Sequence, residues 1–531
     1  MPELLAGIMQ IIHPATILWI AFGVCLGIVL GAIPGLSATM GIALMLPLAI
    51  QFPTAVGMAL LLSVYSGAII GASVPAILLG IPGNPNAIAT IYDGYPMTQN
   101  GRGAEALVGA TIGSFIGGLG SLVLLALFAP LIAQFTLEFG PAERAALALV
   151  GLTIIASITA QDLVKGLLMG AFGLALAFLG PDRITETMRL PFADVTARTP
   201  LANGIGLIPA LIGLFGISQA LIDIERLHAG TLSPPQVSLR GSLPKPRVIA
   251  RMWRMLLESV GIGTFIGAIP GAGASIAVFM AYQRAQQVAA SAKNKLRQLG
   301  TGVVEGVVAP ETANNACKGG ALIPALALGI PGDAASAVLL GALLIKGVVP
   351  GPSLFIDELS LVYAILFAML LANFFMVFFQ LLGIRIFPKI LAIRAAYLLP
   401  LIVVFSMIGS YAVEGRAITA ATYNMGTAVV LGIIGYFMKK NGYPIAPVVL
   451  GLILGDMLEQ NFRRAVRLAG GDYTVFFRSP IAVAFIVLAI VSIWYALRSA
   501  RRKRASQAGS TDSDKSGASQ AGSADSEDSE L

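Results

Sequence analysis

Apolar segments follow one another along almost the whole chain, with only short polar stretches between them. A helix needs about 20 apolar residues to cross the hydrocarbon core of a bilayer, and several segments reach that length. The predicted spans are 57–79, 105–135, 145–160, 165–180, 200–222, 318–345, 358–383, 390–411, 417–437, 443–460 and 479–497. The pattern therefore predicts an all-α polytopic membrane protein with about 11–12 membrane spans.

Two different glycine–proline pentapeptides interrupt the apolar pattern, and each occurs twice. Gly31-Ala-Ile-Pro-Gly35 recurs as Gly267-Ala-Ile-Pro-Gly271, 236 residues later. Leu79-Gly-Ile-Pro-Gly83 recurs as Leu328-Gly-Ile-Pro-Gly332, 249 residues later. The same order in both halves indicates an internal duplication, and broken helices at matching positions are typical of secondary transporters. We refer to these four pentapeptides as breaks 1 to 4, numbered along the chain, so that breaks 1 and 2 fall in the first half.

The segment 256–282 carries break 3 in its middle and has basic clusters on both sides, at 251–254 and 284–297. We interpret it as a re-entrant hairpin that turns at Pro270-Gly271, because both basic clusters then stay cytoplasmic. Each arm would have about 11 residues and a length of roughly 16 Å, half the bilayer core. One kinked, tilted helix is the alternative. With 18–50 as the matching hairpin and five spans between them, the two repeats would be inverted.

These features divide the chain into four predicted parts. Residues 1–222 form the first transmembrane repeat, and 223–254 form a cytoplasmic linker rich in arginine, lysine and proline. Residues 255–500 form the second repeat together with a C-terminal span. Residues 501–531 are rich in Ser, Gly, Ala, Asp and Glu and should be a disordered tail. The basic cluster that precedes this tail places the C-terminus in the cytoplasm.

Composition supports lipid as the solvent, since hydrophobic residues make up 56% of the chain and charged residues 11%. Soluble domains carry about 25% charged residues. The two histidines and two cysteines lie apart from one another, so we expect no metal site, no cofactor and no catalytic cluster. No P-loop motif occurs, and no basic stripe interleaved with aromatics suggests nucleic acid. The N-terminus lacks the basic region and cleavage site of a signal peptide.

The breaks are the strongest candidates for chemistry. Proline blocks a continuous helix and leaves backbone groups unpaired, which a membrane protein tolerates only in a buried or wet cavity. Helix N-termini after a break suit a carboxylate, and exposed carbonyls before it suit Na⁺. The candidate substrate ligands are Ser37, Thr39, Asn84, Asn86, Gly273, Ser275, Asn314, Asn315 and Lys318. The candidate cation-coupling residues are Gly35, Gly83, Gly271, Asp333 and Ser336. Helix capping is the alternative role for any single hydroxyl.

The segment 309–318 brings unusual polarity into an apolar run, and ionisable residues at membrane depth are functional candidates. Lys318 would pair either with a substrate carboxylate or with Glu311, and both readings stay open. Asp333 would either cap a half-helix or coordinate a cation. Asp93 and Arg102 are expected in a cytoplasmic loop with structural roles.

Five segments together carry a resemblance: 31–37, 65–71, 80–86, 309–315 and 329–333. With them the chain resembles the large membrane subunit of the tripartite tricarboxylate transporter family (TctA-like) over about residues 5–500. The resemblance implies a bacterial inner-membrane protein that works with a small membrane subunit (TctB-like) and a periplasmic solute-binding protein (TctC-like). It implies uptake of tricarboxylates or related carboxylates, driven by a Na⁺ or H⁺ gradient.

A stand-alone carboxylate/ion symporter or a channel, acting without a binding protein, is the alternative function. A channel needs a continuous polar pore, and the sequence shows no ring of repeated charges. An intramembrane enzyme is disfavoured, because Ser37 lacks the second glycine of a nucleophile elbow. We expect a carrier with alternating access, with an elevator-like motion inferred only by analogy.

Overall fold

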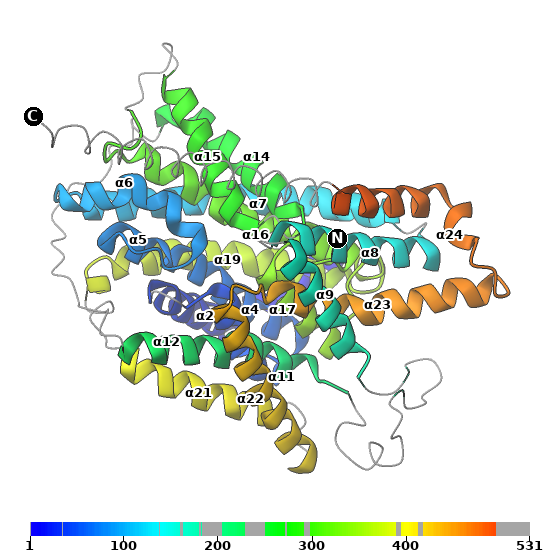
Figure 1. The fold of residues 1–531 in the computed structure, drawn as a ribbon. Coiled ribbons are helices and arrows are strands. Elements are labelled where there is room, and N and C mark those ends of the chain that lie inside the picture. The colour runs from blue at the N-terminus through cyan, green and yellow to red at the C-terminus, as the bar shows by residue number, and fades with distance from the viewer. Residues whose placement is uncertain are drawn as a thin grey trace, which may run out of the picture.

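The computed structural model describes residues 2–33, 36–136, 139–159, 163–179, 182, 189, 204–228, 250–270, 273–290, 298–388, 395–412 and 418–494. Within these residues every regular element is a helix (Figure 1). Six helices are long and apolar enough to cross a membrane: Pro14–Ala32, Thr54–Leu79, Gly103–Thr136, Leu207–Glu225, Leu359–Gly383 and Thr419–Lys440. The prediction of an all-α polytopic membrane protein is confirmed. The total number of spans and the inversion of the repeats stay predictions.

Two sets of helices carry the breaks. The first set consists of α2 (Pro14–Ala32), α3 (Ala38–Ala49), α4 (Thr54–Gly71), α5 (Ser73–Leu79), the 3₁₀-helix η1 (Pro85–Ala87), α6 (Ile88–Gln99) and α7 (Gly103–Thr136). The second set consists of α14 (Trp253–Ala268), α15 (Gly273–Ala290), α16 (Glu305–Leu328), α17 (Ala334–Ile345), α18 (Leu354–Asp357) and α19 (Leu359–Gly383). The sets interlock, because α16 packs on α7 and α6 while α19 packs on α4 and α2.

The remaining helices surround this centre (Figure 1). They are α1 (Pro2–Ile12), α8 (Pro141–Thr159), α9 (Leu163–Ala177), α11 (Leu207–Leu211), the π-helix η3 (Ile212–Ile217), α12 (Ser218–His228), α21 (Ala395–Ala412), α22 (Ile418–Lys440), α23 (Ala446–Leu468), α24 (Val475–Arg478) and Pro480–Trp494. In Figure 1 the group of α12, α21 and α22 lies on the side away from α14 and α15. On the right of that view, α23 packs against α8 and α9.

Helix α16 forms the middle of the molecule. Each of its residues from Glu305 to Ala327 is buried, and α4 is nearly as enclosed. An α16 that touches other helices on all sides cannot rely on lipid for solvation, so its polar side chains must find partners inside the protein. Four of those side chains, at 311, 314, 315 and 318, are the ones that the sequence singled out.

The predicted span 318–345 is wrong. Helix α16 begins earlier, at Glu305, and ends at Leu328, and α17 begins only at Ala334. Gly329 ends α16 with φ of +72°, a left-handed conformation that suits glycine. The apolar character of both helices hid this interruption from a reading based on hydrophobic length.

Asp93 lies in helix α6, where a loop was expected, and it is fully buried. Its carboxylate accepts hydrogen bonds from the Tyr282 hydroxyl at 2.8 Å and from the backbone N–H groups of Gly302 and Val303 at 2.9 Å each. The side chain therefore ties α6 to α15 and to the approach to α16.

Helices α14 and α15 pack against each other. Glu258 on α14 binds Arg254 at 3.0 Å and Arg284 of α15 at 2.8 Å, so the two basic flanks of break 3 meet at one carboxylate. The chain turns back at this break, although its position relative to the bilayer stays a prediction. The predicted linker 223–254 begins inside α12, its residues 229–249 lie outside the described residues, and so does the predicted tail 501–531.

Candidate functional site

The helix starts that follow the four breaks meet at one cavity of about 200 Å³. Its lining includes residues just after every break, together with residues of α4 and α16. Those used below are Ser37, Thr39, Tyr65, Asn84, Asn86, Gly273, Asn314 and Asp333. Ser37 and Asp333, 296 positions apart in the sequence, thus line the same cavity.

Each break contributes the start of a helix to this cavity. Ser37 caps α3 by accepting from the Met40 N–H at 3.2 Å, and Asp333 caps α17 by accepting from the Ser336 N–H at 2.7 Å. Asn84 caps η1, which continues directly into α6, and α15 begins at Gly273. A cap satisfies only part of the four free N–H groups at a helix start, and each start carries about half a positive charge. Four such starts bring partial positive charges to the cavity, beside the carboxylate of Asp333.

Breaks 2 and 4 share one backbone geometry. Gly80 ends α5 with φ of +68° and Gly329 ends α16 with φ of +72°. Four residues later, Asn84 and Asp333 cap the next helix with φ of −148° and −147°. Duplicated pentapeptides have therefore kept the same turn, with an amide cap in one copy and a carboxylate cap in the other.

The last glycine of breaks 2 and 4 lies against the backbone of the preceding break. A Cβ on Gly83 would lie 2.8 Å from the carbonyl oxygen of Gly31, and one on Gly332 would lie 2.5 Å from the carbonyl oxygen of Gly267. Real Cβ atoms do not approach oxygen so closely, so only glycine fits. This close approach is what brings breaks 1 and 2, and likewise breaks 3 and 4, to the same place.

Two hydrogen bonds then join the two copies at the cavity. Ser275 of α15 donates to the amide oxygen of Asn86 at 2.7 Å. The Tyr65 hydroxyl on α4 donates to the Asp333 carboxylate at 2.5 Å. Asp333 therefore acts as a helix cap, the simpler of its two predicted roles, and also holds the tyrosine that faces the cavity.

Among the residues that line the cavity, Asn314 has a side-chain amide without a hydrogen-bond partner. It lies on α16 with 1% of its surface exposed and lines the cavity. Neither its amide nitrogen nor its amide oxygen has a hydrogen-bond partner among the residues that the structure describes. Leaving a buried polar group unpaired costs about 1–3 kcal/mol, so the amide is poised to bind a ligand that enters the cavity.

Glu311 and Lys318 of α16 occupy separate polar clusters. The Glu311 carboxylate accepts hydrogen bonds from the hydroxyls of Thr90 at 2.6 Å and Ser114 at 3.4 Å. The Lys318 ammonium donates to Ser66 at 2.8 Å and to the Asn373 amide oxygen at 3.2 Å. The hypothesis of a Lys318–Glu311 ion pair is therefore wrong for this structure.

The predicted site residues fall into three groups. Those that line the cavity are Ser37, Thr39, Asn84, Asn86, Gly273, Asn314 and Asp333. Those next to it are Gly83, Ser275, Asn315, Lys318 and Ser336, none of which is part of the lining. Gly35 and Gly271 lie outside the described residues. Binding of substrate or cation by any of them stays a prediction.

Among the lining side chains that can form hydrogen bonds, the sequence reading missed Tyr65 and Cys317. Tyr65 carries the one phenol of α4 and stands directly before Ser66-Gly67 in an otherwise apolar stretch, which was the available signal. Cys317 was interpreted as a buried structural thiol, and its thiol does donate to the Gly263 carbonyl at 3.1 Å.

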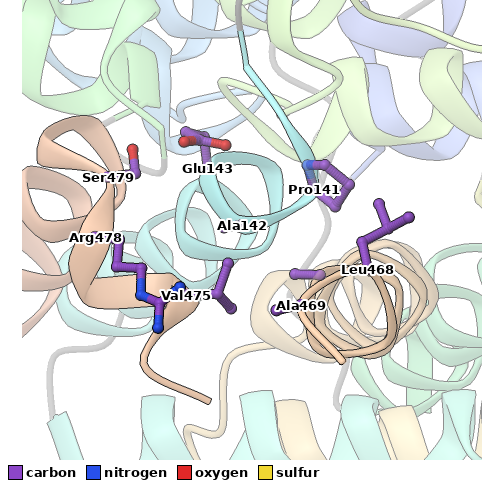
Figure 2. Close-up of a pocket in the computed structure, with 9 residues that line it drawn as sticks. Pro141, Ala142, Glu143, Leu468, Ala469, Val475, Arg478 and Ser479 are labelled. Carbon is purple, nitrogen blue, oxygen red and sulfur yellow. The ribbon is translucent and has the colours of Figure 1, made fainter. Parts of the chain in front are cut away.

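A second hollow of about 460 Å³ lies at the edge of the molecule (Figure 2). Its lining comes from the start of α8, the end of α23 and the α24 region: Pro141, Ala142, Glu143, Ala465, Leu468, Ala469, Val475, Arg478 and Ser479. None of the helix starts that follow the breaks contributes to it. The cavity between the breaks is therefore the candidate functional site.

Broken helices whose starts converge on one cavity define a polytopic membrane protein with the architecture of a secondary transporter. Residues 17–450 match the model of the tripartite tricarboxylate transporter TctA family, and the chain belongs to that family. This confirms the resemblance seen in the sequence motifs.

Two relatives from Agrobacterium vitis are similar to this chain. An uncharacterized 52.8 kDa protein in the TAR-I ttuC' 3' region is 32% identical over 499 residues, which cover 94% of this chain and 96% of the relative. An uncharacterized protein in the TAR-II ttuC' 3' region is 34% identical over 245 residues, covering 46% of this chain and 98% of the relative. No solved structure matches.

Proposed function

We propose that this chain is the large transmembrane subunit of a binding-protein-dependent secondary transporter that takes up tricarboxylates or related carboxylates. The observation that carries the proposal is the convergence of four helix starts and the unpartnered Asn314 amide on one cavity. Helix N-termini and amides suit carboxylate groups, and membership of the TctA family supports the substrate class.

The charge of the cavity supports coupling to a cation. Among the described residues, no lysine or arginine lines it, and Asp333 contributes a carboxylate. A multiply charged anion beside that carboxylate would leave excess negative charge at membrane depth, which is unfavourable. A co-bound Na⁺ or H⁺ reduces the excess, so uptake would be driven by the gradient of one of these ions.

The size of the cavity supports a small substrate. Sites for drug-sized molecules have volumes of about 300–1,000 Å³. The volume of about 200 Å³ here suits a compact organic acid. Selection among such acids would fall largely to a periplasmic solute-binding protein (TctC-like), with a small membrane subunit (TctB-like) completing the complex in the bacterial inner membrane and the C-terminus in the cytoplasm.

Reconstitution tests this proposal against the alternative of a stand-alone symporter or channel. The purified chain would be placed in liposomes with and without its small subunit and binding protein, and uptake of a labelled tricarboxylate would be measured. We expect saturable uptake that requires the binding protein and an imposed Na⁺ or H⁺ gradient. Saturable gradient-driven uptake without the binding protein would indicate a stand-alone symporter. Unsaturable current without a gradient requirement would indicate a channel.

A further inference from the structure

Glu311 is a fully buried carboxylate in the middle of α16. Both of its hydrogen bonds come from hydroxyl groups, Thr90 on α6 and Ser114 on α7. A hydroxyl can donate to a carboxylate and can equally accept from a carboxylic acid. The environment of Glu311 therefore accommodates its protonated and its deprotonated form without a change of partners.

No cation binds Glu311 within the described structure. Lys318, seven residues further along α16, is held by Ser66 and Asn373. On the helices packed against α16 the titratable and charged groups are Tyr65, Tyr92, Asp93, Tyr95, Arg102, Glu105, Arg254, Glu258, Tyr282, Arg284, Asp333 and Asp357, and α16 itself adds Glu305 and Cys317.

The basic groups in that set are already engaged. Arg102 binds Glu105 at 2.8 Å, and Arg254 and Arg284 bind Glu258. An ionised carboxylate with no cation is strongly disfavoured in a site that other helices enclose completely, so the neutral acid is the form that fits this conformation.

Glu311 also lies between two elements of the cavity. Thr90, its closer partner at 2.6 Å, is in the first turn of α6, directly after the helix start that presents Asn84 and Asn86 to the cavity. On the other side, Glu311 precedes the cavity-lining Asn314 by one turn of α16. A change in the charge of Glu311 therefore acts on both the Thr90 contact and the wall that carries Asn314.

We propose that Glu311 is the binding site of the proton that drives uptake. This inference rests on the proposed function and specifies its coupling ion. On the outer side a proton from water forms an O–H bond with one carboxyl oxygen of Glu311. On the inner side that bond breaks and the proton returns to water, with no electron transferred. Proton binding and substrate binding favour each other, because each stabilises the loaded cavity.

Comparing proton-driven accumulation with substrate exchange at equal pH distinguishes a loss of proton coupling from a general loss of transport. Wild type, Glu311→Gln and the matched control Glu258→Gln would be reconstituted with their partner subunits. Glu311→Gln mimics the neutral acid, so we expect proton-driven accumulation to fall by about tenfold or more while substrate exchange at equal pH continues. Glu258→Gln should retain both activities. Proton-driven accumulation by Glu311→Gln at the wild-type level would overturn the proposal, and so would wild-type uptake driven by Na⁺ at clamped pH.

Infrared spectroscopy decides the case in which Glu311→Gln loses exchange as well. In wild type a protonated-carboxyl band should disappear as the pH is raised, be absent in Glu311→Gln, and shift in Glu311→Asp. The same band in Glu311→Gln would show that another group carries the proton and would end the proposal. Failure of the proposed function looks different, since wild type and Glu258→Gln would then take up and exchange no carboxylate at all.

Discussion

Ser275 donates a hydrogen bond of 2.7 Å to the side-chain oxygen of Asn86, although the two residues are 189 positions apart. The bond joins the first turn of α15 to the helix start that follows break 2. Asn86 therefore reaches the cavity with its amide oriented by a residue from the other set of helices. Any movement that separates the two sets must break this hydrogen bond or move both residues together.

Replacement of Ser275 tests whether this orientation matters. Ser275→Ala removes the donor and leaves Asn86 free to rotate, so we expect the KM for carboxylate uptake to rise about three- to tenfold with little change in protein yield. Ser353→Ala is the matched control, because Ser353 is exposed and makes no capping hydrogen bond with its side chain. Equal kinetics for both variants would show that Asn86 needs no such support.

Asn314 should separate binding from stability. Asn314→Ala removes two buried groups that have no partner in the structure, so the free energy of unfolding should change less than for most buried polar residues. Substrate affinity should nevertheless fall about tenfold, which corresponds to about 1.4 kcal/mol. Thermal unfolding with and without substrate measures both quantities. Asn441→Ala, at an exposed position after α22, is the control, and a similar loss of affinity there would contradict the assignment.

Gly332 should tolerate no side chain. In Gly332→Ala the new Cβ would lie 2.5 Å from the Gly267 carbonyl oxygen and 2.6 Å from the Cα of Ala321. We expect a loss of about 1–3 kcal/mol in stability, since breaks 3 and 4 would have to separate. Gly261→Ala is the control, because a Cβ there meets nothing within 4 Å. Melting temperatures in detergent compare the two, and equal melting temperatures would contradict the close approach.

Asp93 should act as a structural anchor. In Asp93→Asn the amide oxygen can keep the place of Oδ1, but an NH₂ group then replaces Oδ2 and faces the Gly300 N–H, which donates to Oδ2 at 2.9 Å. We expect about 2–4 kcal/mol of destabilisation. Tyr282→Phe removes only the 2.8 Å hydroxyl bond and should cost about 1 kcal/mol. The reverse order of these two effects in thermal unfolding would show that the backbone contacts are unimportant.

Topology around break 3 can be tested by chemical labelling. Arg254 and Arg284 share the Glu258 carboxylate, so cysteines placed singly at the two positions should react with a membrane-impermeant reagent from the same side. The cytoplasmic side is expected from the positive-inside rule. Labelling from opposite sides would exclude the re-entrant hairpin and restore the single kinked span.

The sequence predicted the breaks because their causes are local. Proline removes a backbone N–H and glycine permits a left-handed turn at any position in a chain. The breaks at 80–83 and 329–332 could therefore be identified without knowing which helices pack around them. The small polar residues after each break could be identified for the same reason. The span 318–345 was wrong because hydrophobic length joined the apolar segments on both sides of break 4, although the glycine–proline pattern marked a turn there.

The partners of the charged residues could not be predicted, because they come from other helices. Glu311 meets Thr90 and Ser114, which are 221 and 197 positions away. Lys318 meets Ser66 from 252 positions away. The sequence shows that charged residues are unusual in an apolar segment. Their hydrogen-bond partners, however, depend on which faces of the helices pack against each other in the fold.

The complete enclosure of α16 has a consequence for biogenesis. The ribosome releases α4, α6 and α7 long before α16 exists, so their hydroxyls at Ser66, Thr90 and Ser114 first face lipid or the insertion machinery. The nascent first half has no finished interior of its own. The space between α4, α6 and α7 must stay unfilled until the second half is synthesised and α16 inserts between these helices.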